Sequence, residues 1–356
     1  MFKKVLFLFS ITTSLFGEFE YRVENSNFTI SQDEFRYNYD RLRFRGDFID
    51  ENYFTTVIAD IVHYYGGNYL SSDEFSFIKQ IQSDTPIKTE TSFKKYADAL
   101  FYAKLYRFYL GYEDDTHRTV IGLQNISMGV GRVWTPTDIF NPKNIYSIEP
   151  DETFGVFALS YTNHLNDSSD IEMIVSIDEE KKPKYAGIYK TFFQLGDFAL
   201  DFIYSPKTVM LGGELEINIG ESGVEGRVEV AYIKNDIGEF SQIIMGVDYG
   251  FLNGLNLIVE TLYSSKTFSY TELLLNYDSE IISNMHYSSF YTAVVLSYSF
   301  NIFLDTSFIY IESFNDKNSR FLSPTVSYTI DDYNSILFGA TINSGDSYYL
   351  KYSLIF

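Results

Sequence analysis

Apolar and polar residues alternate along most of the chain with a period of two residues. In one clear segment, Leu211 and Leu215 fall on one side of an extended backbone, and Glu214 and Glu216 fall on the other. This period is typical of strands with one apolar and one polar face. Such segments follow one another with turn residues between them and no helical pattern of comparable length, so the sequence predicts an all-β fold.

Composition narrows the choice of all-β architecture. The chain has 31 Tyr and 33 Phe, yet its mean hydropathy is -0.10, and no segment after Phe16 is continuously apolar for long enough to form a membrane helix. Half-exposed strands of a soluble sheet would alternate in the same way. Repetition over almost the whole chain favours a transmembrane antiparallel β-barrel of about 18 strands, with 16 as the alternative if the N-terminal hairpin is over-counted.

The predicted turns divide into two sets when they are counted backwards from Phe356 at the periplasmic rim. Three of the longest connections, Tyr65 to Ser92, Val130 to Glu152 and Ser265 to His286, then fall on the extracellular side. Barrels of this class have short periplasmic turns and long extracellular loops. The count therefore agrees with the predicted fold class.

The chain ends on an alternating segment with an aromatic last residue. Tyr348, Leu350, Tyr352, Leu354 and Phe356 share one face. This tail resembles the C-terminal signature of Gram-negative outer-membrane proteins and porins, and the resemblance implies that Phe356, Leu354 and Tyr352 form an assembly signal read by the barrel assembly machinery. An edge strand of a soluble β-sandwich is the alternative for the tail alone.

The N-terminus has the pattern of an export signal. Lys3 and Lys4 precede the apolar run Val5 to Phe16, and Gly17 offers a small residue at the cleavage point. Because Leu15 stands where a smaller residue is usual, the cut could fall a residue or two either side of Gly17. We expect a signal peptide at residues 1–17 and a single transmembrane β-barrel domain at residues 18–356, located in the bacterial outer membrane.

The most distinctive local sequence is Gly129 to Pro142, which holds the only Trp. An Arg and a Trp followed by a Pro-containing turn and Asp-x-Phe-Asn-Pro resembles an element of uncharacterised or alginate-export-like porin families. Its two Pro residues restrict the backbone, and Asp138 and Asn141 favour turn hydrogen bonds, so a stiff loop is expected. Either it folds into the lumen with Arg132, Trp134 and Asp138 as a pore constriction, or it packs on the barrel rim with the Trp as an interfacial anchor.

A second candidate site is the set of charges that alternation directs into the lumen. Arg41, Arg43 and Arg45 alternate with Leu42 and Phe44, which predicts a ladder of guanidinium groups on the inner wall. The same parity directs inward Asp201, Glu214, Glu216, Glu225, Arg227, Glu229, Asp248, Glu260 and Asp305. Opposed rings of charge can filter ions and small polar solutes. The plainer interpretation is that these groups pair with one another within the wall.

Other chemistry finds little support in the sequence. There is no Cys for disulfides, and the formal net charge of -21 argues against nucleic acid as a partner. Of the four His residues, three fall at strand ends or in loops without a Ser, Asp or metal-ligand partner at a recognisable spacing, so no metal, cofactor or enzymatic activity is expected.

These observations predict a porin with a water-filled channel for passive diffusion of ions and small polar solutes. The expected partners are outer-membrane lipid and lipopolysaccharide, the barrel assembly machinery and the solutes themselves, and the chain could form a homotrimer. A structural or adhesive barrel with ligand-binding outer loops is the alternative function. A barrel hydrolase with catalytic residues on distant strands is a third.

Overall fold

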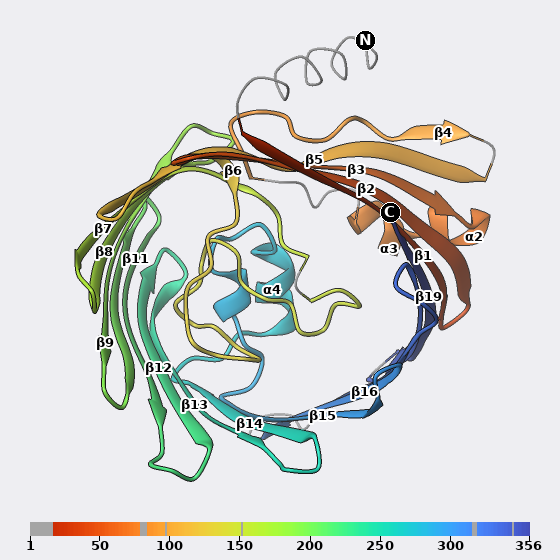
Figure 1. Ribbon diagram of the computed structural model, residues 1–356. Coiled ribbons are helices and arrows are strands. Elements are labelled where there is room, and N and C mark those ends of the chain that lie inside the picture. The colour runs from red at the N-terminus through yellow and green to blue at the C-terminus, as the bar shows by residue number, and fades with distance from the viewer. Residues whose placement is uncertain (1–16, 79–83, 97, 151, 315–318, 344) are drawn as a thin grey trace.

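A computed structural model describes residues 17–356 apart from 79–83, 97, 151, 315–318 and 344 (Figure 1). The predicted signal peptide at residues 1–17 lies outside the described residues except for Gly17. Within this part of the chain, no helix is both long enough and apolar enough to cross a membrane.

Alternating sequence gives strands over most of the chain, as the pattern predicts. The strands are β1 (Glu18–Gln32), β2 (Phe35–Asp50), β3 (Tyr53–Tyr65), β4 (Lys94–Tyr96), β5 (Ala99–Glu113), β6 (His117–Gln124), β7 (Val156–Asn166), β8 (Ser169–Ile177), β9 (Pro183–Phe193), β10 (Gly196–Tyr204), β11 (Thr208–Asn218), β12 (Val224–Asn235), β13 (Gly238–Gly250), β14 (Leu255–Ser264), β15 (Phe290–Asn301), β16 (Leu304–Phe314), β17 (Arg320–Thr329), β18 (Asn334–Thr341) and β19 (Ser347–Ile355).

The strands form a closed antiparallel barrel. Each pairs with its neighbours in chain order, and β1 pairs with β19 to close the ring. The three-residue β4 pairs only with β5, while β3 pairs with β5 directly, so the barrel itself has 18 strands. The prediction of an all-β barrel of about 18 strands is confirmed. At the seam, the backbone N–H of Phe356 donates to the carbonyl of Val23 at 2.8 Å, and the N–H of Val23 donates in return at 3.2 Å.

The outer surface of the barrel is apolar and aromatic. On β10, Leu200 and Phe202 are about half exposed, whereas Asp201 and Ile203 between and beyond them are buried on the inner side. The last strand follows the same rule, since Tyr348, Leu350 and Tyr352 are exposed as predicted. An apolar band facing outward is what contact with lipid requires.

The three long connections lie at one end of the barrel. The β3–β5 connection carries α2 (Gly67–Leu70) and α3 (Asp73–Ile78), and the β14–β15 connection carries α4 (Tyr270–Leu275) and a 3-10 turn η1 (Ile282–Asn284). The β6–β7 connection, residues 125–155, has no helix or strand among its described residues. Their common end agrees with the predicted alternation of short turns and long loops.

Two of these connections fold into the barrel rather than away from it (Figure 1). Residues 125–155 and the α4 segment lie inside the ring of strands, where Phe140 packs in a buried cluster with Phe268 and Met285. Inward-facing wall residues such as Met210 and Ile233 complete this cluster. A hydrophobic core therefore occupies part of the lumen, against the β7–β13 side of the wall.

Candidate functional site

The infolded segment begins where β6 leaves the wall at Gln124. Asn141 Oδ1 accepts the N–H of Ile126 at 2.7 Å, and Asp138 Oδ2 accepts the N–H of Met128 at 3.2 Å. The other oxygen of Asp138 accepts the N–H groups of Phe140 and Asn141 at 3.0 and 2.8 Å. The expected turn hydrogen bonds of Asp138 and Asn141 are therefore present.

Asp138 is buried by these contacts and does not face the lumen. Its side chain is 1% exposed. Burial raises the pKa of Asp138 to about 6, although the N–H groups of Asn141, Met128 and Phe140 act to lower it. The carboxyl group therefore organises the loop and presents no charge to a solute.

Wall carboxylates hold the segment through its backbone. Glu260 on β14 accepts three successive N–H groups, from Arg132 at 2.8 Å, Val133 at 3.0 Å and Trp134 at 2.9 Å. Hydrogen bonds to a charged acceptor are stronger than those between neutral groups. The single residue Glu260 therefore fixes the conformation of the Arg-Val-Trp turn.

A second carboxylate, Glu229 on β12, holds the neighbouring residues. It accepts the N–H groups of Val130 at 3.0 Å, Gly131 at 3.2 Å and Thr137 at 2.7 Å. Glycine is required at 131, because a Cβ there would lie 1.6 Å from the carbonyl oxygen of Trp134. The Gly-rich stretch thus lets the backbone approach the wall closely enough to bind Glu229.

Trp134 lies inside the barrel and is mostly buried. It packs in a cluster with Ile244, Leu262 and Tyr291, and its ring centroid lies 6.0 Å from that of Tyr291. The structure thus places it against the inner wall and not at an interface between barrel and membrane.

Arg132 is the member of the predicted constriction whose charge reaches solvent. Its side chain is 40% exposed and lies 2.8 Å from Glu225, 3.2 Å from Asp248 and 3.7 Å from Glu216. Buried Arg227 also pairs with Asp248 and, at 3.2 Å, with Glu225. Two guanidinium groups therefore share a wall that carries more carboxylates than cations.

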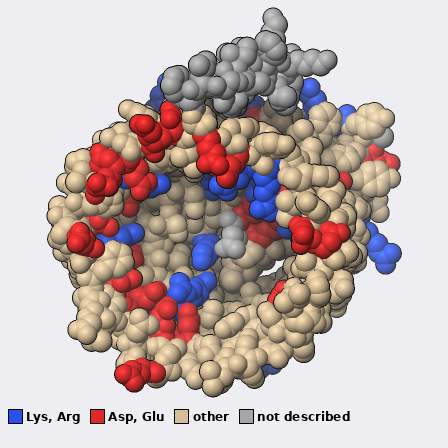
Figure 2. Space-filling view, viewed as in Figure 1, with Lys and Arg blue, Asp and Glu red and all other residues tan. Residues whose placement is uncertain are grey.

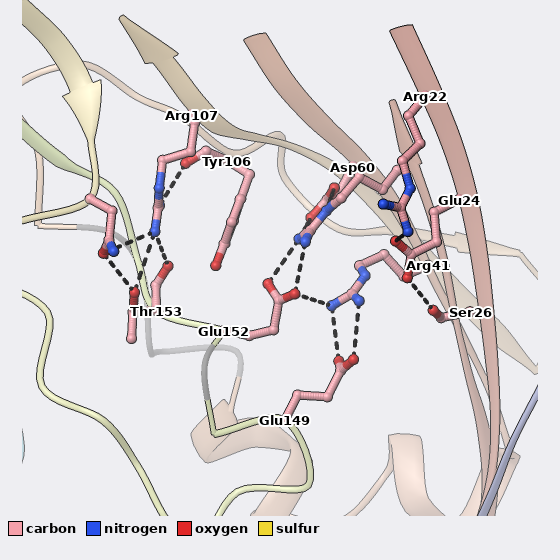
Figure 3. Close-up of polar contacts among 12 residues, drawn as sticks. Arg22, Glu24, Ser26, Arg41, Asp60, Tyr106, Arg107, Glu149, Glu152 and Thr153 are labelled. Atoms are coloured by element: carbon pink, nitrogen blue, oxygen red, sulfur yellow. Dashed lines mark hydrogen bonds and ion pairs between the residues drawn. The ribbon is translucent and has the colours of Figure 1, made fainter. Parts of the chain in front are cut away.

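The far part of the segment is tied to the opposite wall by ion pairs (Figure 3). Arg41 on β2 binds Glu149 through two hydrogen bonds of 2.9 and 3.0 Å. Arg43 binds Glu152 at 2.7 and 2.9 Å and Asp60 on β3 at 2.7 Å. Arg41 and Arg43, the first two residues of the predicted Arg ladder, thus point inward. They hold Glu149 and Glu152, which we call the tip of the infolded segment.

The ion pairs with Arg43 and Arg41 lower the pKa of Glu152. Burial acts to raise it, but the hydrogen bond from Arg43 and the charges of Arg41 and Arg43 outweigh burial and lower the pKa to about 2. Glu152 is therefore ionised over the whole physiological pH range. The ion pairs of Glu152 with Arg41 and Arg43 persist as long as Glu152 stays ionised.

The remaining predicted lumen charges fall into three groups. Arg45 is half exposed and binds Asp47 at 2.6 Å, and Asp305 accepts the Ser299 hydroxyl at 2.5 Å. Glu214 on β11 accepts the N–H of Gly129 at 2.8 Å and so assists Glu229. Asp201 is buried on the inner side of β10. Most of the set is therefore engaged in pairs or loop contacts, as the plainer interpretation had it.

Sequence reasoning missed the partners that the infolded segment supplies. Glu149, Glu152 and Asp60 were not singled out, although each binds a predicted ladder residue, and Lys351 on β19 also approaches Glu149, at 3.1 Å. One signal was available in the sequence. The loop carboxylates Glu149 and Glu152 are three residues apart, and Arg41 and Arg43 lie two residues apart on one face of a predicted strand.

Charged side chains of both signs line the hollow (Figure 2). Basic side chains lie beneath β2 to β5 next to acidic ones, and acidic side chains gather on the β12–β13 side next to basic ones. Among the described residues, no group of three or more His, Asp or Glu side chains is placed to hold a metal ion. The arrangement can orient and sort solutes by charge.

Comparison with known proteins supports the fold. No protein-family model matches the chain, and no curated protein sequence matches it. Solved structures do. OccAB1 of Acinetobacter baumannii aligns with a TM-score of 0.63 at 8% identity, covering 96% of both chains. OccK5 (OpdH) of Pseudomonas aeruginosa aligns with a TM-score of 0.62 at 8% identity, covering 95% of this chain and 98% of that one. A BenF-like porin from Pseudomonas fluorescens Pf-5 gives 0.60 at 9% identity, with the same coverage. The barrel is the fold of these porins.

Proposed function

We propose that this protein is an outer-membrane porin that lets ions and small polar solutes diffuse passively through a lumen narrowed by residues 125–155. One observation carries the proposal. A closed barrel with an apolar outer face encloses a segment that is tied to charged wall residues on both sides of the lumen. A barrel of this strand number is wide enough to leave an aqueous channel unless something fills it.

The tied segment supports a channel of fixed cross-section rather than a plugged barrel. Glu260 and Glu229 attach one end to β14 and β12, and Arg41 and Arg43 attach the other to β2. Because residues 125–155 are attached to the wall at both ends, the passage beside them is bounded by the segment on one side and by the barrel wall on the other. Small polar solutes then meet charged groups held in place and need no energy source to cross.

Within this passage, Arg132 is the proposed selectivity residue. Trp134 and Asp138, predicted with it as the constriction, are buried, and we assign them to holding the turn that presents Arg132. The carboxylates around Arg132 give that side of the passage an acidic field, which favours cations.

We also propose the export, assembly and lipid surroundings that the sequence predicts for an outer-membrane protein. Residues 1–17 act as a signal peptide, the chain is inserted by the barrel assembly machinery, and the barrel is surrounded by lipid and lipopolysaccharide. A homotrimer is the proposed assembly state, to be measured by the mass of the detergent-solubilised protein.

Reconstitution in a planar bilayer tests the function. Purified folded protein should give stepwise ion currents and should let small sugars and amino acids enter liposomes. An adhesive or structural barrel with a closed lumen would insert without current, and that result would overturn the proposal.

A further inference from the structure

A cavity of about 330 Å³ lies between the β1–β5 wall and the tip of the infolded segment. This is within the range of about 300–1,000 Å³ that small-molecule sites occupy. One side of the cavity is aromatic, with Tyr39, Tyr64 and Tyr102 lining it. The other side is formed by the infolded segment with Glu149 and Glu152, which pair with Arg41 on β2.

We propose that this cavity binds a small neutral polyhydroxylated ring, the chemistry of a monosaccharide, on its way through the channel. The proposal rests on the porin function and names the solute class of the same lumen. It follows from three properties of the cavity: unused hydroxyl groups, balanced charge and a two-sided lining.

The hydroxyl groups of Tyr39, Tyr64 and Tyr102 are available to a ligand. None of the described residues makes a hydrogen bond to any of them, and none of the three oxygens is a buried unpaired atom. Lys104 is also available, because its nearest carboxylate, Glu90, lies 3.8 Å away. A tyrosine hydroxyl both donates and accepts, so these groups match alcohol functions better than they match a carboxylate.

The charged side chains that line the cavity are held in pairs. Arg41 pairs with Glu149 and Glu152, Asp60 pairs with Arg43, which does not line the cavity, and Lys104 lies 3.8 Å from Glu90. A free anion would meet three carboxylates, and a free cation would meet two positive groups. A neutral solute meets neither repulsion and can still accept from Lys104 and donate to the carboxylate oxygens.

The two-sided lining matches the shape of a pyranose. The ring centroids of Tyr39 and Tyr64 lie 5.1 Å apart, and the ring centroids of Tyr39 and Phe28 lie 5.5 Å apart. The C–H face of a sugar ring is apolar and packs on such rings, while its hydroxyl edge faces polar groups. The ion-pair layer provides those polar groups on the opposite side.

Current block in a planar bilayer tests the proposal. D-glucose added to the wild-type channel should reduce the ion current with a saturable concentration dependence, and D-glucuronate and D-glucosamine, which have the same ring with a charge, should block less well. Tyr39→Phe, Tyr64→Phe and Tyr102→Phe should each raise the half-blocking glucose concentration about 2- to 10-fold, the value of one neutral hydrogen bond. These hydroxyls have no hydrogen-bond partner among the residues that the structure describes, so the variants should fold, which heat-modifiable migration checks.

Tyr109→Phe is the matched control, since Tyr109 lies on β5, the strand of Tyr102, but lines a separate cavity nearer the short turns. It should leave the half-blocking concentration unchanged. Stronger block by either charged analogue, or equal block of the control and the three variants, would overturn the sugar site. A wild-type protein that carries no current at all would instead overturn the porin function.

Discussion

Thr137 donates two hydrogen bonds to Glu229 Oε1, from its backbone nitrogen at 2.7 Å and from its hydroxyl at 2.8 Å. The two residues are 92 positions apart and meet on the inner face of β12. A carboxylate on the wall thus acts as one of the brackets that hold the segment in the lumen.

Removing this bracket should loosen the segment. Glu229→Ala leaves the N–H groups of Val130, Gly131 and Thr137 without their acceptor, and we expect the free energy of unfolding to fall by about 1–3 kcal/mol. Single-channel conductance should rise and become noisier as the segment gains freedom. Glu221→Ala, in an exposed short turn, is the control and should change neither quantity. Unaltered conductance and stability in the Glu229 variant would contradict the bracket.

Arg132 should govern ion selectivity. A unit charge about 8 Å from a permeating ion in water changes its energy by about 0.5 kcal/mol, so Arg132→Gln should raise the cation-to-anion permeability ratio roughly two- to fivefold. Reversal potential in a salt gradient measures this ratio.

Asp138→Asn is the matched substitution on the same loop. The sequence placed Asp138 in a possible pore constriction, but the carboxyl group is buried in its own turn. We now expect no shift. A change as large as that of the Arg132 variant would show that Asp138 faces the pore.

Acid should release the tip of the segment. The folded-state pKa of Glu152, about 2, lies below its ordinary value of 4.5, so its ion pairs stabilise fully above pH 4.5 and this stabilisation is lost as pH falls toward 2. Conductance should change as the pH falls from about 4.5 toward 2. Glu152→Gln should show the altered conductance already at pH 7. A transition centred near neutral pH would refute this account.

The terminal aromatic residue should control the yield of folded barrel. Phe356→Ser keeps the backbone hydrogen bonds to Val23 but removes an exposed ring, and deletion of Phe356 removes both. We expect less folded, heat-modifiable protein in the outer membrane for Phe356→Ser and less still for the deletion. Phe300→Ser, which alters an exposed aromatic at the same end of the barrel, should retain the wild-type yield. Equal yields from all variants would count against the assembly signal.

The outer face and strand order could be predicted from sequence because lipid contact imposes one simple rule on every second residue. Leu42 and Phe44 are exposed, and Arg41 and Arg43 point inward, as parity requires. Each turn contains residues that interrupt the alternation of apolar and polar positions. The number of strands could therefore be counted from the sequence.

The lumen contents could not be predicted by the same rule. A loop that lies inside a barrel is held by contacts with residues far away in sequence, as Glu260 holds Trp134. One signal was present. Inward positions near the long-loop end, such as Ile203, Ile233 and Leu262, are apolar, which a water-filled lumen does not need. Strands that are apolar on both faces near one end indicate that something covers the inner face there.

The pairing of Val23 with Phe356 also constrains how the molecule forms. Contacts between residues so distant in sequence carry the largest loop-closure entropy, and topologies rich in such contacts fold slowly. The β1–β19 seam cannot form until the last residue has been delivered, so closure comes late and the first strand must wait with an unpaired edge. Exposed strand edges aggregate readily. The interval before the seam closes is therefore when the chain most needs protection by chaperones.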